Sequence, residues 1–220
     1  MIGILITVTI VYSILHHYYC IKLRGVLANK IRVLSRRQAF LLLNWLFRVL
    51  IPLILAMELG LSPFELGYSL PSDYMKTLIL TLLLIALNIS VSFTFVWIAV
   101  NVLREEKALR KVEKWPSRLG LKDIIEGFLW DFPEEAFYRG FIFMCLKTLG
   151  IIPAALFSSF LFALVHTYAG RTWTLMTFIN GLIYSYAIYQ TDSILVPLIL
   201  HRVLNISPPL YLRIFSKCNS

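Results

Sequence analysis

The stretch FPEEAFYRG, residues 132–140, places two carboxylates and a guanidinium within an apolar run long enough to cross a membrane. Ionisable side chains at membrane depth cost roughly 2.5–3.5 kcal/mol each on insertion scales, so their presence indicates a function. Polar residues also interrupt two later apolar runs, where His166 follows Phe162 and His201 precedes Asn205. Together these residues predict a catalytic site inside a membrane.

The composition is that of an integral membrane protein. Of the 220 residues, 59% are hydrophobic and 15% are charged, and the mean hydropathy is +0.76. A soluble domain has about 45–50% apolar and about 25% charged residues. The net charge of +9 does not indicate nucleic-acid binding, because the basic residues lie in short loops between apolar runs. We therefore expect one membrane-embedded domain over residues 1–220, in contact with the lipid bilayer.

Seven apolar runs have about the length that spans a hydrocarbon core of about 30 Å. They predict an all-α fold, a polytopic membrane bundle of about seven transmembrane helices. The runs cover residues 1–20, 38–58, 75–103, 122–147, 150–168, 173–190 and 193–212. The N-terminal helices, within residues 1–103, carry no motif and are expected to be accessory.

The placement of lysine and arginine predicts the orientation. Six basic residues follow the first run and seven follow the third, whereas residues 58–73 include none. The positive-inside rule places the two basic loops in the cytoplasm and the N-terminus outside. Glu134 then lies roughly 18 Å along its helix from the cytoplasmic end. His166 and His201 also fall in the cytoplasmic halves of their runs, so we expect a site that opens toward the cytoplasm.

Helical spacing separates the two adjacent glutamates. Glu135 and Arg139 are four residues apart and share a helix face, so they can form an ion pair. Glu134 points about 100° away and can face a cavity. Pro133 cannot donate a backbone hydrogen bond and is expected to kink the helix, which would help to open a pocket.

The chemistry that fits these residue types is hydrolysis. A carboxylate with a neighbouring histidine can hold and deprotonate a water molecule. An imidazole N–H and an amide can stabilise the oxyanion that forms when the water attacks a carbonyl. The predicted site therefore consists of the catalytic residues Glu134, His166, His201 and Asn205 and the supporting residues Glu135, Arg139 and Phe162.

Each of these groups also has a structural interpretation. A buried Glu–Arg pair can be a clamp, a histidine can be an interhelical donor, and an asparagine can join helices. The sequence assigns no role in the site to Asp131, Glu126 or Arg202, and Arg48 is expected to snorkel or to line the bundle interior. Cys145 is a less attractive nucleophile, because it lies about 16 Å along the helix from the glutamate pair.

Three motifs follow one another in order on three of the last four hydrophobic runs: Glu134-Glu135-x-x-x-Arg139, Phe162-x-x-x-His166 and His201-x-x-x-Asn205. Over residues 120–212 this order resembles the CAAX protease and bacteriocin-processing family, also called the Abi family or the type II CAAX prenyl endopeptidases.

The resemblance implies an intramembrane glutamate-dependent peptidase that uses no metal and no cofactor. It implies that Glu134 and His166 activate the water, and that His201 and Asn205 form the oxyanion hole. The implied partner is a peptide or prenylated-protein substrate that enters from the cytoplasmic side and is cleaved near its C-terminus.

Other functions remain open from the sequence. Glu134, His166 and His201 are residue types that could bind zinc in a membrane peptidase, although no His-Glu-x-x-His motif is present. A non-catalytic immunity or scaffold protein could have the same fold. Buried glutamate and histidine could also relay protons in a transporter. The sequence predicts no oligomeric state.

Overall fold

The computed structural model describes residue 11 and residues 35–105 and 120–207, and its regular elements there are all helices. In chain order they are α2 (Arg36–Trp45), the π-helix η1 (Leu46–Leu50), α3 (Ile51–Glu58), α4 (Tyr74–Trp97), the π-helix η2 (Ile98–Val102), α6 (Leu121–Glu135), the π-helix η3 (Ala136–Phe143), α7 (Met144–Leu146), the 3₁₀ turn η4 (Lys147–Leu149), α8 (Ile151–Leu164), the 3₁₀ turn η5 (Thr167–Ala169), α9 (Arg171–Thr191) and α10 (Leu195–Ile206). The all-α prediction is confirmed. Six predicted runs correspond to helices, and the run 1–20 lies outside the described residues except for residue 11.

Side chains at the helix ends explain where several helices begin. Ser35 and Gln38 form a capping box at α2, in which the Ser35 Oγ accepts from the Gln38 N–H at 3.2 Å. At α4 the Asp73 carboxylate accepts from the backbone N–H of Lys76 at 2.9 Å. These caps satisfy N–H groups that have no partner within their own helix.

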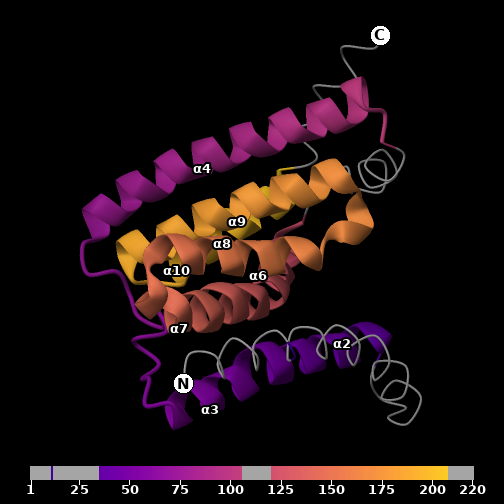
Figure 1. Ribbon diagram of the computed structural model, residues 1–220. Coiled ribbons are helices and arrows are strands. Elements are labelled where there is room, and N and C mark those ends of the chain that lie inside the picture. Colours follow the sequence, from indigo (N-terminus) through magenta and orange to yellow (C-terminus); the bar gives the residue numbers. More distant parts are fainter. Residues whose placement is uncertain (1–10, 12–34, 106–119, 208–220) are drawn as a thin grey trace.

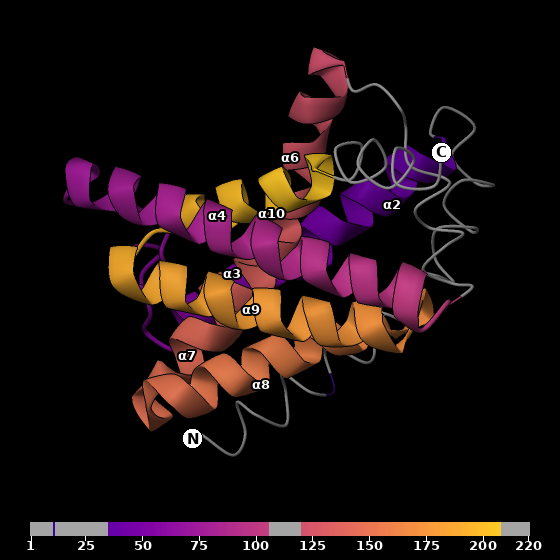
Figure 2. The same cartoon turned by 90° about the horizontal axis from the view of Figure 1, so that it is seen from above.

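The helices pack in three levels (Figure 1). α4 lies on one side, the continuous helix α2–η1–α3 lies on the other, and α6 to α10 lie between them. α9 packs against α4, α8 and α10, and α10 also packs against α6. Seen from above, α6 crosses the direction of α4 and α9 steeply (Figure 2). Distance along α6 is therefore not a direct measure of depth along the bundle.

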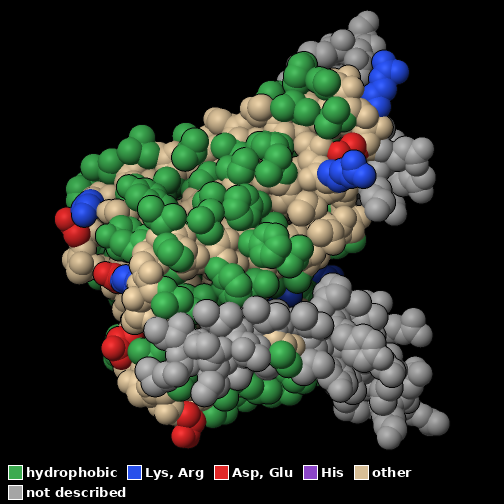
Figure 3. All heavy atoms as spheres, in the orientation of Figure 1, with side chains coloured by type: hydrophobic (Ala, Val, Ile, Leu, Met, Phe, Trp, Pro, Cys, Tyr) green, Lys and Arg blue, Asp and Glu red, His purple; other side chains and the backbone are tan. Residues whose placement is uncertain are grey.

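Within the described residues, two helices are long and apolar enough to cross a membrane, namely Arg37–Glu58 and Tyr74–Val102. The second has 29 residues and rises about 43 Å, more than a hydrocarbon core of about 30 Å requires. Figure 3 shows hydrophobic side chains over this face of the molecule, with charged side chains toward its two ends. The remaining predicted spans are shorter or carry polar residues, so the number seven stays a prediction.

Two sets of contacts mark opposite ends of the bundle. At one end, the loop 59–73 is hydrogen-bonded to the α9–α10 turn, and Lys147 pairs with Asp192 at 3.4 Å. At the other end, the Glu105 carboxylate accepts from the Thr172 hydroxyl at 2.5 Å and joins the end of η2 to the start of α9. The segments that the basic-residue pattern assigned to the outer side thus lie together.

Candidate active site

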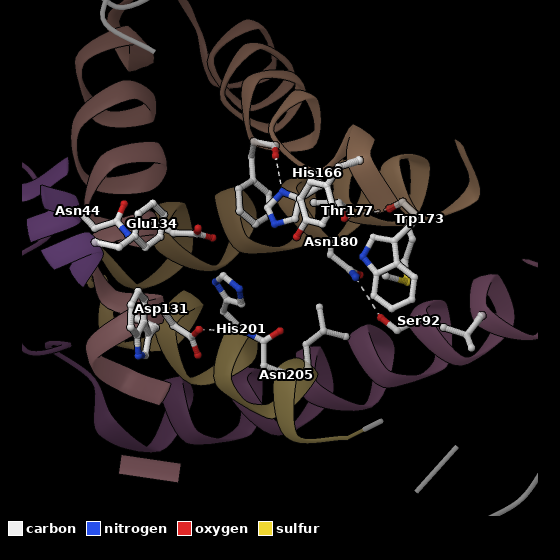
Figure 4. Close-up of a pocket in the computed structure, with 17 residues that line it drawn as sticks. Asn44, Ser92, Asp131, Glu134, His166, Trp173, Thr177, Asn180, His201 and Asn205 are labelled. Atoms are coloured by element: carbon white, nitrogen blue, oxygen red, sulfur yellow. Dashed lines mark hydrogen bonds between the residues drawn. The ribbon is translucent and has the colours of Figure 1, made fainter. Parts of the chain in front are cut away.

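An open cavity of about 260 Å³ lies among α2, α4, α6, α9, α10 and the turn after α8. The four predicted catalytic residues all line it, and so does Phe162. Figure 4 shows Glu134, His166 and His201 around one space, with Asn205 close to His201. The three motifs, which are separate in the sequence, therefore meet at a single cavity.

The position of Glu134 on α6 depends on how the helix accommodates Pro133. Proline has no N–H to donate to the carbonyl of Leu129, four residues earlier. The indole Nε1–H of Trp45 on α2 donates to that carbonyl oxygen at 3.1 Å instead. The same indole stacks on Phe132, with ring centroids 5.1 Å apart. Pro133 thus couples α6 to α2 directly beside Glu134, and the chain becomes π-helical at Ala136.

Glu134 forms an ion pair with Arg48 of η1, with 2.7 Å between Oε1 and Nη1. The Glu134 side chain keeps 23% exposure, which faces the cavity, whereas that of Arg48 keeps 7%. One carboxylate oxygen is thus held by the guanidinium, and Oε2 can contact a bound water. Arg48 lines the bundle interior, as the sequence allowed, but its pairing with Glu134 was not predicted.

Glu135 lies behind the cavity and is completely buried. Its Oε1 is 2.7 Å from Nδ1 of His201, and its Oε2 is 3.4 Å from Nε of Arg139. The expected pairing of Glu135 with Arg139 is present, and the two glutamates face different surroundings. Because Nδ1 of His201 is engaged by Glu135, Nε2 is the ring nitrogen that can serve a substrate.

The Arg139 guanidinium is completely buried among aromatic rings. It lies 4.4 Å from the ring centroid of Phe162 and 5.1 Å from that of Tyr184, at cation–π distance. Gly181 makes room for it, because a Cβ there would lie 3.0 Å from Arg139 Nη2. Arg139 therefore forms an ion pair with Glu135 and also packs against the aromatic rings beside the histidines.

Phe162 contacts both histidines. Its ring centroid is 4.8 Å from that of His166 and 5.7 Å from that of His201, edge to face in both cases. His166 does not continue the helix with Phe162, as the run 150–168 suggested, because α8 ends at Leu164. With φ −102° and ψ 4°, His166 lies in the turn before η5. This bridge conformation is frequent for active-site residues.

The tautomer of His166 follows from its partner. Nδ1 is 2.8 Å from the carbonyl oxygen of Phe162. A carbonyl oxygen can only accept, so Nδ1 carries a proton and Nε2 of the neutral ring is an acceptor. His166 also interacts electrostatically with Glu134. This arrangement suits a histidine that receives a hydrogen bond from water.

Asn205 donates from Nδ2 to Oδ1 of Asp131 at 2.9 Å. The other carboxylate oxygen of Asp131 accepts from Nη1 of Arg202 at 3.0 Å. Asp131 and Arg202, which the sequence left without a role, thus join α6 to α10 within the site. A signal was present, because Asp131 precedes Glu134 by three residues and lies on a neighbouring position of the helix surface.

Helices α4 and α9, which carry none of the three motifs, also line the cavity. There, Nδ2 of Asn180 on α9 donates to Oγ of Ser92 on α4 at 3.0 Å (Figure 4). Helix α4 was expected to be accessory, and in the structure it supplies part of the cavity wall. The other lining residues from these two helices are Val96, Trp173, Met176 and Thr177.

A zinc site is not formed by the candidate ligands. Across residues 35–105 and 120–207, no three His, Cys, Asp or Glu side chains come together in a way that could hold a metal ion. Glu134, His166 and His201 share the cavity, but the first is bound to Arg48 and the last to Glu135.

The helices that carry this geometry, from α6 to α10, also carry the family signature. Residues 123–207 match the family model of Rce1-like type II CAAX prenyl endopeptidases. The resemblance inferred from the three motifs is confirmed for this Rce1-like segment, which covers less than half of the chain. The family is membrane-embedded and its name denotes a protease. Comparison with curated proteins and with solved structures gives no significant match.

Proposed function

We propose that the protein is an intramembrane endopeptidase that hydrolyses a peptide bond near the C-terminus of a CAAX-type substrate. The observation that carries the proposal is the cavity of the Rce1-like segment, which is lined by Glu134, His166, His201 and Asn205. These side chains come from three separate segments and combine a carboxylate, two imidazoles and an amide. That set provides both a base for water and donors for an oxyanion.

Water activation is assigned to Glu134 and His166. A water molecule between them would donate one hydrogen bond to Oε2 of Glu134 and the other to Nε2 of His166. The lone pair on the water oxygen would then face the substrate carbonyl. Arg48 fixes the carboxylate and the Phe162 carbonyl fixes the imidazole, so both acceptors are held before the substrate binds.

Oxyanion stabilisation is assigned to His201 and Asn205. When Nδ1–H of His201 is donated to Glu135, Nε2 donates only if the ring is an imidazolium, whose charge Glu135 would balance. The second N–H of the Asn205 amide would be the other donor. Removal of one such donor typically slows turnover by about 10²–10³.

The proposed reaction is balanced without a cofactor. The water oxygen forms a bond to the carbonyl carbon while its proton passes to Glu134. The tetrahedral intermediate then collapses, the C–N bond breaks, and Glu134 returns the proton to the leaving amine. The products are a short C-terminal peptide and a new carboxylic acid, which releases the second water proton to the solvent and becomes a carboxylate.

For the whole chain we propose seven membrane spans, an outer N-terminus and a site that opens to the cytoplasm. The pattern of basic loops supports this orientation. The clustering of the loop 59–73, Lys147 and the α9–α10 turn at one end of the bundle agrees with it.

The test is cleavage by purified protein of a farnesylated CAAX peptide, the same peptide without the lipid, and an unprenylated peptide library. Mass spectrometry of the products identifies the bond that is cut. We expect cleavage near the C-terminus by the wild-type protein and none by Glu134→Gln. Cleavage of the lipidated peptide alone would assign a prenylated substrate. If no peptide is cut, the endopeptidase proposal is wrong.

Removal of metal ions distinguishes the proposed glutamate-dependent mechanism from a zinc-dependent peptidase. We expect a strong chelator to leave the cleavage rate unchanged, since the side chains proposed to activate water are held by protein groups. A rate that falls with chelator and returns when zinc is added would contradict the proposed mechanism. A zinc-dependent peptidase of known activity, treated in parallel, is the control for chelation.

A further inference from the structure

We infer that Asp131 is a positioning residue that holds the Asn205 amide in the orientation needed to stabilise the oxyanion. This inference rests on the proposed function and assigns a role that the three motifs do not include. Both residues line the cavity, and the hydrogen bond between them measures 2.9 Å.

Asn205 needs an external constraint. It is the penultimate residue of α10, it is exposed, and it lines the cavity. A free asparagine side chain rotates about two torsions, so its amide would sample several directions. When Asn205 donates one N–H to Asp131, the plane of its amide is fixed. The second N–H of the amide then points in a single direction. Preorganised donors of this kind need no reorganisation during the reaction.

Asp131 is itself held by a cation. Asp131 is 5% exposed, and its carboxylate accepts at 3.0 Å from Arg202, which is 8% exposed. With one oxygen on Arg202 and the other on Asn205, the carboxylate cannot turn without losing a hydrogen bond. Arg202 thus holds Asp131, and Asp131 in turn holds the Asn205 amide.

Arg202 can occupy its position only because residue 127 is glycine. A Cβ at Gly127 would lie 1.4 Å from Nη1 of Arg202 and 2.1 Å from its Cζ. Any side chain at this position would displace the guanidinium. The glycine on α6 therefore controls, through Arg202 and Asp131, the amide of Asn205 on α10.

A double-mutant cycle on the full-length protein separates positioning from general stabilisation. We expect Asp131→Ala to lower kcat about tenfold to a hundredfold with little change in KM, since an oxyanion donor acts in the transition state. In an Asn205→Ala background the same change should lower kcat no further. Asp131→Asn, whose amide oxygen can still accept from Asn205, should retain more activity than Asp131→Ala. Equal loss of kcat in both backgrounds would overturn the inference.

A second variant avoids any change in the polar residues. Gly127→Ala should lower kcat in the wild-type background and not in the Asn205→Ala background. The matched control is Gly120→Ala at the start of α6, where the added Cβ would lie an ordinary 3.4 Å from Asp123. If Gly127→Ala and Gly120→Ala leave kcat equally unchanged, Arg202 does not hold Asp131 in the position that orients Asn205, and this part of the inference is wrong.

The outcomes also separate this inference from the proposed function. If the wild-type protein cleaves a peptide but Asp131→Ala lowers kcat equally in the wild-type and Asn205→Ala backgrounds, only the inference about Asp131 is contradicted. Full activity in Glu134→Gln contradicts the proposed water activation, while the cycle still tests Asp131. A wild-type protein that cleaves none of the peptides contradicts both.

Discussion

Glu134 and Glu135 are neighbours in the sequence, but the structure gives them different surroundings. Glu134 faces the cavity and one of its oxygens is bound to Arg48. Glu135 is completely buried between His201 and Arg139. A group that exchanges protons with water must be able to contact it. We therefore propose that Glu134 activates the water and that Glu135 orients His201.

Arg48 should matter for turnover as well as for stability. Replacing Arg48 by Met leaves Glu134 without its cation and free to rotate, so we expect kcat to fall at least about tenfold. The free energy of unfolding should fall by about 1–3 kcal/mol, because a largely buried carboxylate loses a charged partner. Peptide cleavage and chemical denaturation in detergent measure the two effects.

The matched control for that change is Arg37→Met. Arg37 pairs with Glu126 at 3.0 Å, but its side chain is 68% exposed, and exposed ion pairs contribute about 0–1 kcal/mol. We expect kcat to remain as in the wild type. If Arg48→Met also kept normal turnover, Arg48 would have no part in fixing the base.

At the scale of single helices, Pro133 and Trp45 act together. The indole supplies the hydrogen bond that proline cannot give to the Leu129 carbonyl. We expect Trp45→Phe to lower the free energy of unfolding by about 0.5–1.5 kcal/mol, since it removes the hydrogen bond to the Leu129 carbonyl. In a Pro133→Ala background the new backbone N–H can reach that carbonyl, so the same change should cost less.

Denaturation of the four proteins in one detergent measures this cycle. The phenylalanine keeps the stacking on Phe132, so the comparison isolates the indole N–H. Equal costs of Trp45→Phe with proline and with alanine at position 133 would show that the hydrogen bond to Leu129 contributes nothing.

Helix existence and the different directions of the two glutamates could be predicted from periodicity, because both depend on residues close in sequence. The spacing of Glu135 and Arg139 indicated their ion pair, and the structure has it. The end of α8 before His166 could not be predicted, because the apolar run continues past the helix. The π-helical segments were not predicted either, since they carry no distinct sequence pattern.

At the scale of the whole molecule, the two ends of the bundle should lie on opposite sides of the membrane. Phe64 in the loop 59–73 is exposed, and Lys122 at the start of α6 is exposed as well. In a protein whose native cysteines are replaced, we expect Phe64→Cys to react with an impermeant maleimide from the outside. Lys122→Cys should react only after the membrane is permeabilised.

Labelling of the cysteine-free protein is the control for background. Reaction of both positions from the same side, or the reverse assignment, would contradict the proposed orientation.

Contacts between distant helices were the part that the sequence could not predict. Arg48 interrupts the apolar run 38–58 and is costly there, which is a signal, but nothing in the spacing pairs it with Glu134. Likewise, no pattern on α4 indicates that Ser92 lines the cavity with Asn180. These contacts depend on how the helices pack, whereas the motifs report only neighbours on one helix.

The central claim is that Glu134 activates the water. Its most direct test is the single-turnover cleavage rate of Glu134→Gln beside the wild type, with binding of the same peptide measured for both. The substitution keeps the size of the side chain and removes its ability to take a proton. We predict unchanged binding and a rate at least about a hundredfold lower. A Glu134→Gln protein that binds and cleaves the peptide at the wild-type rate would contradict the account.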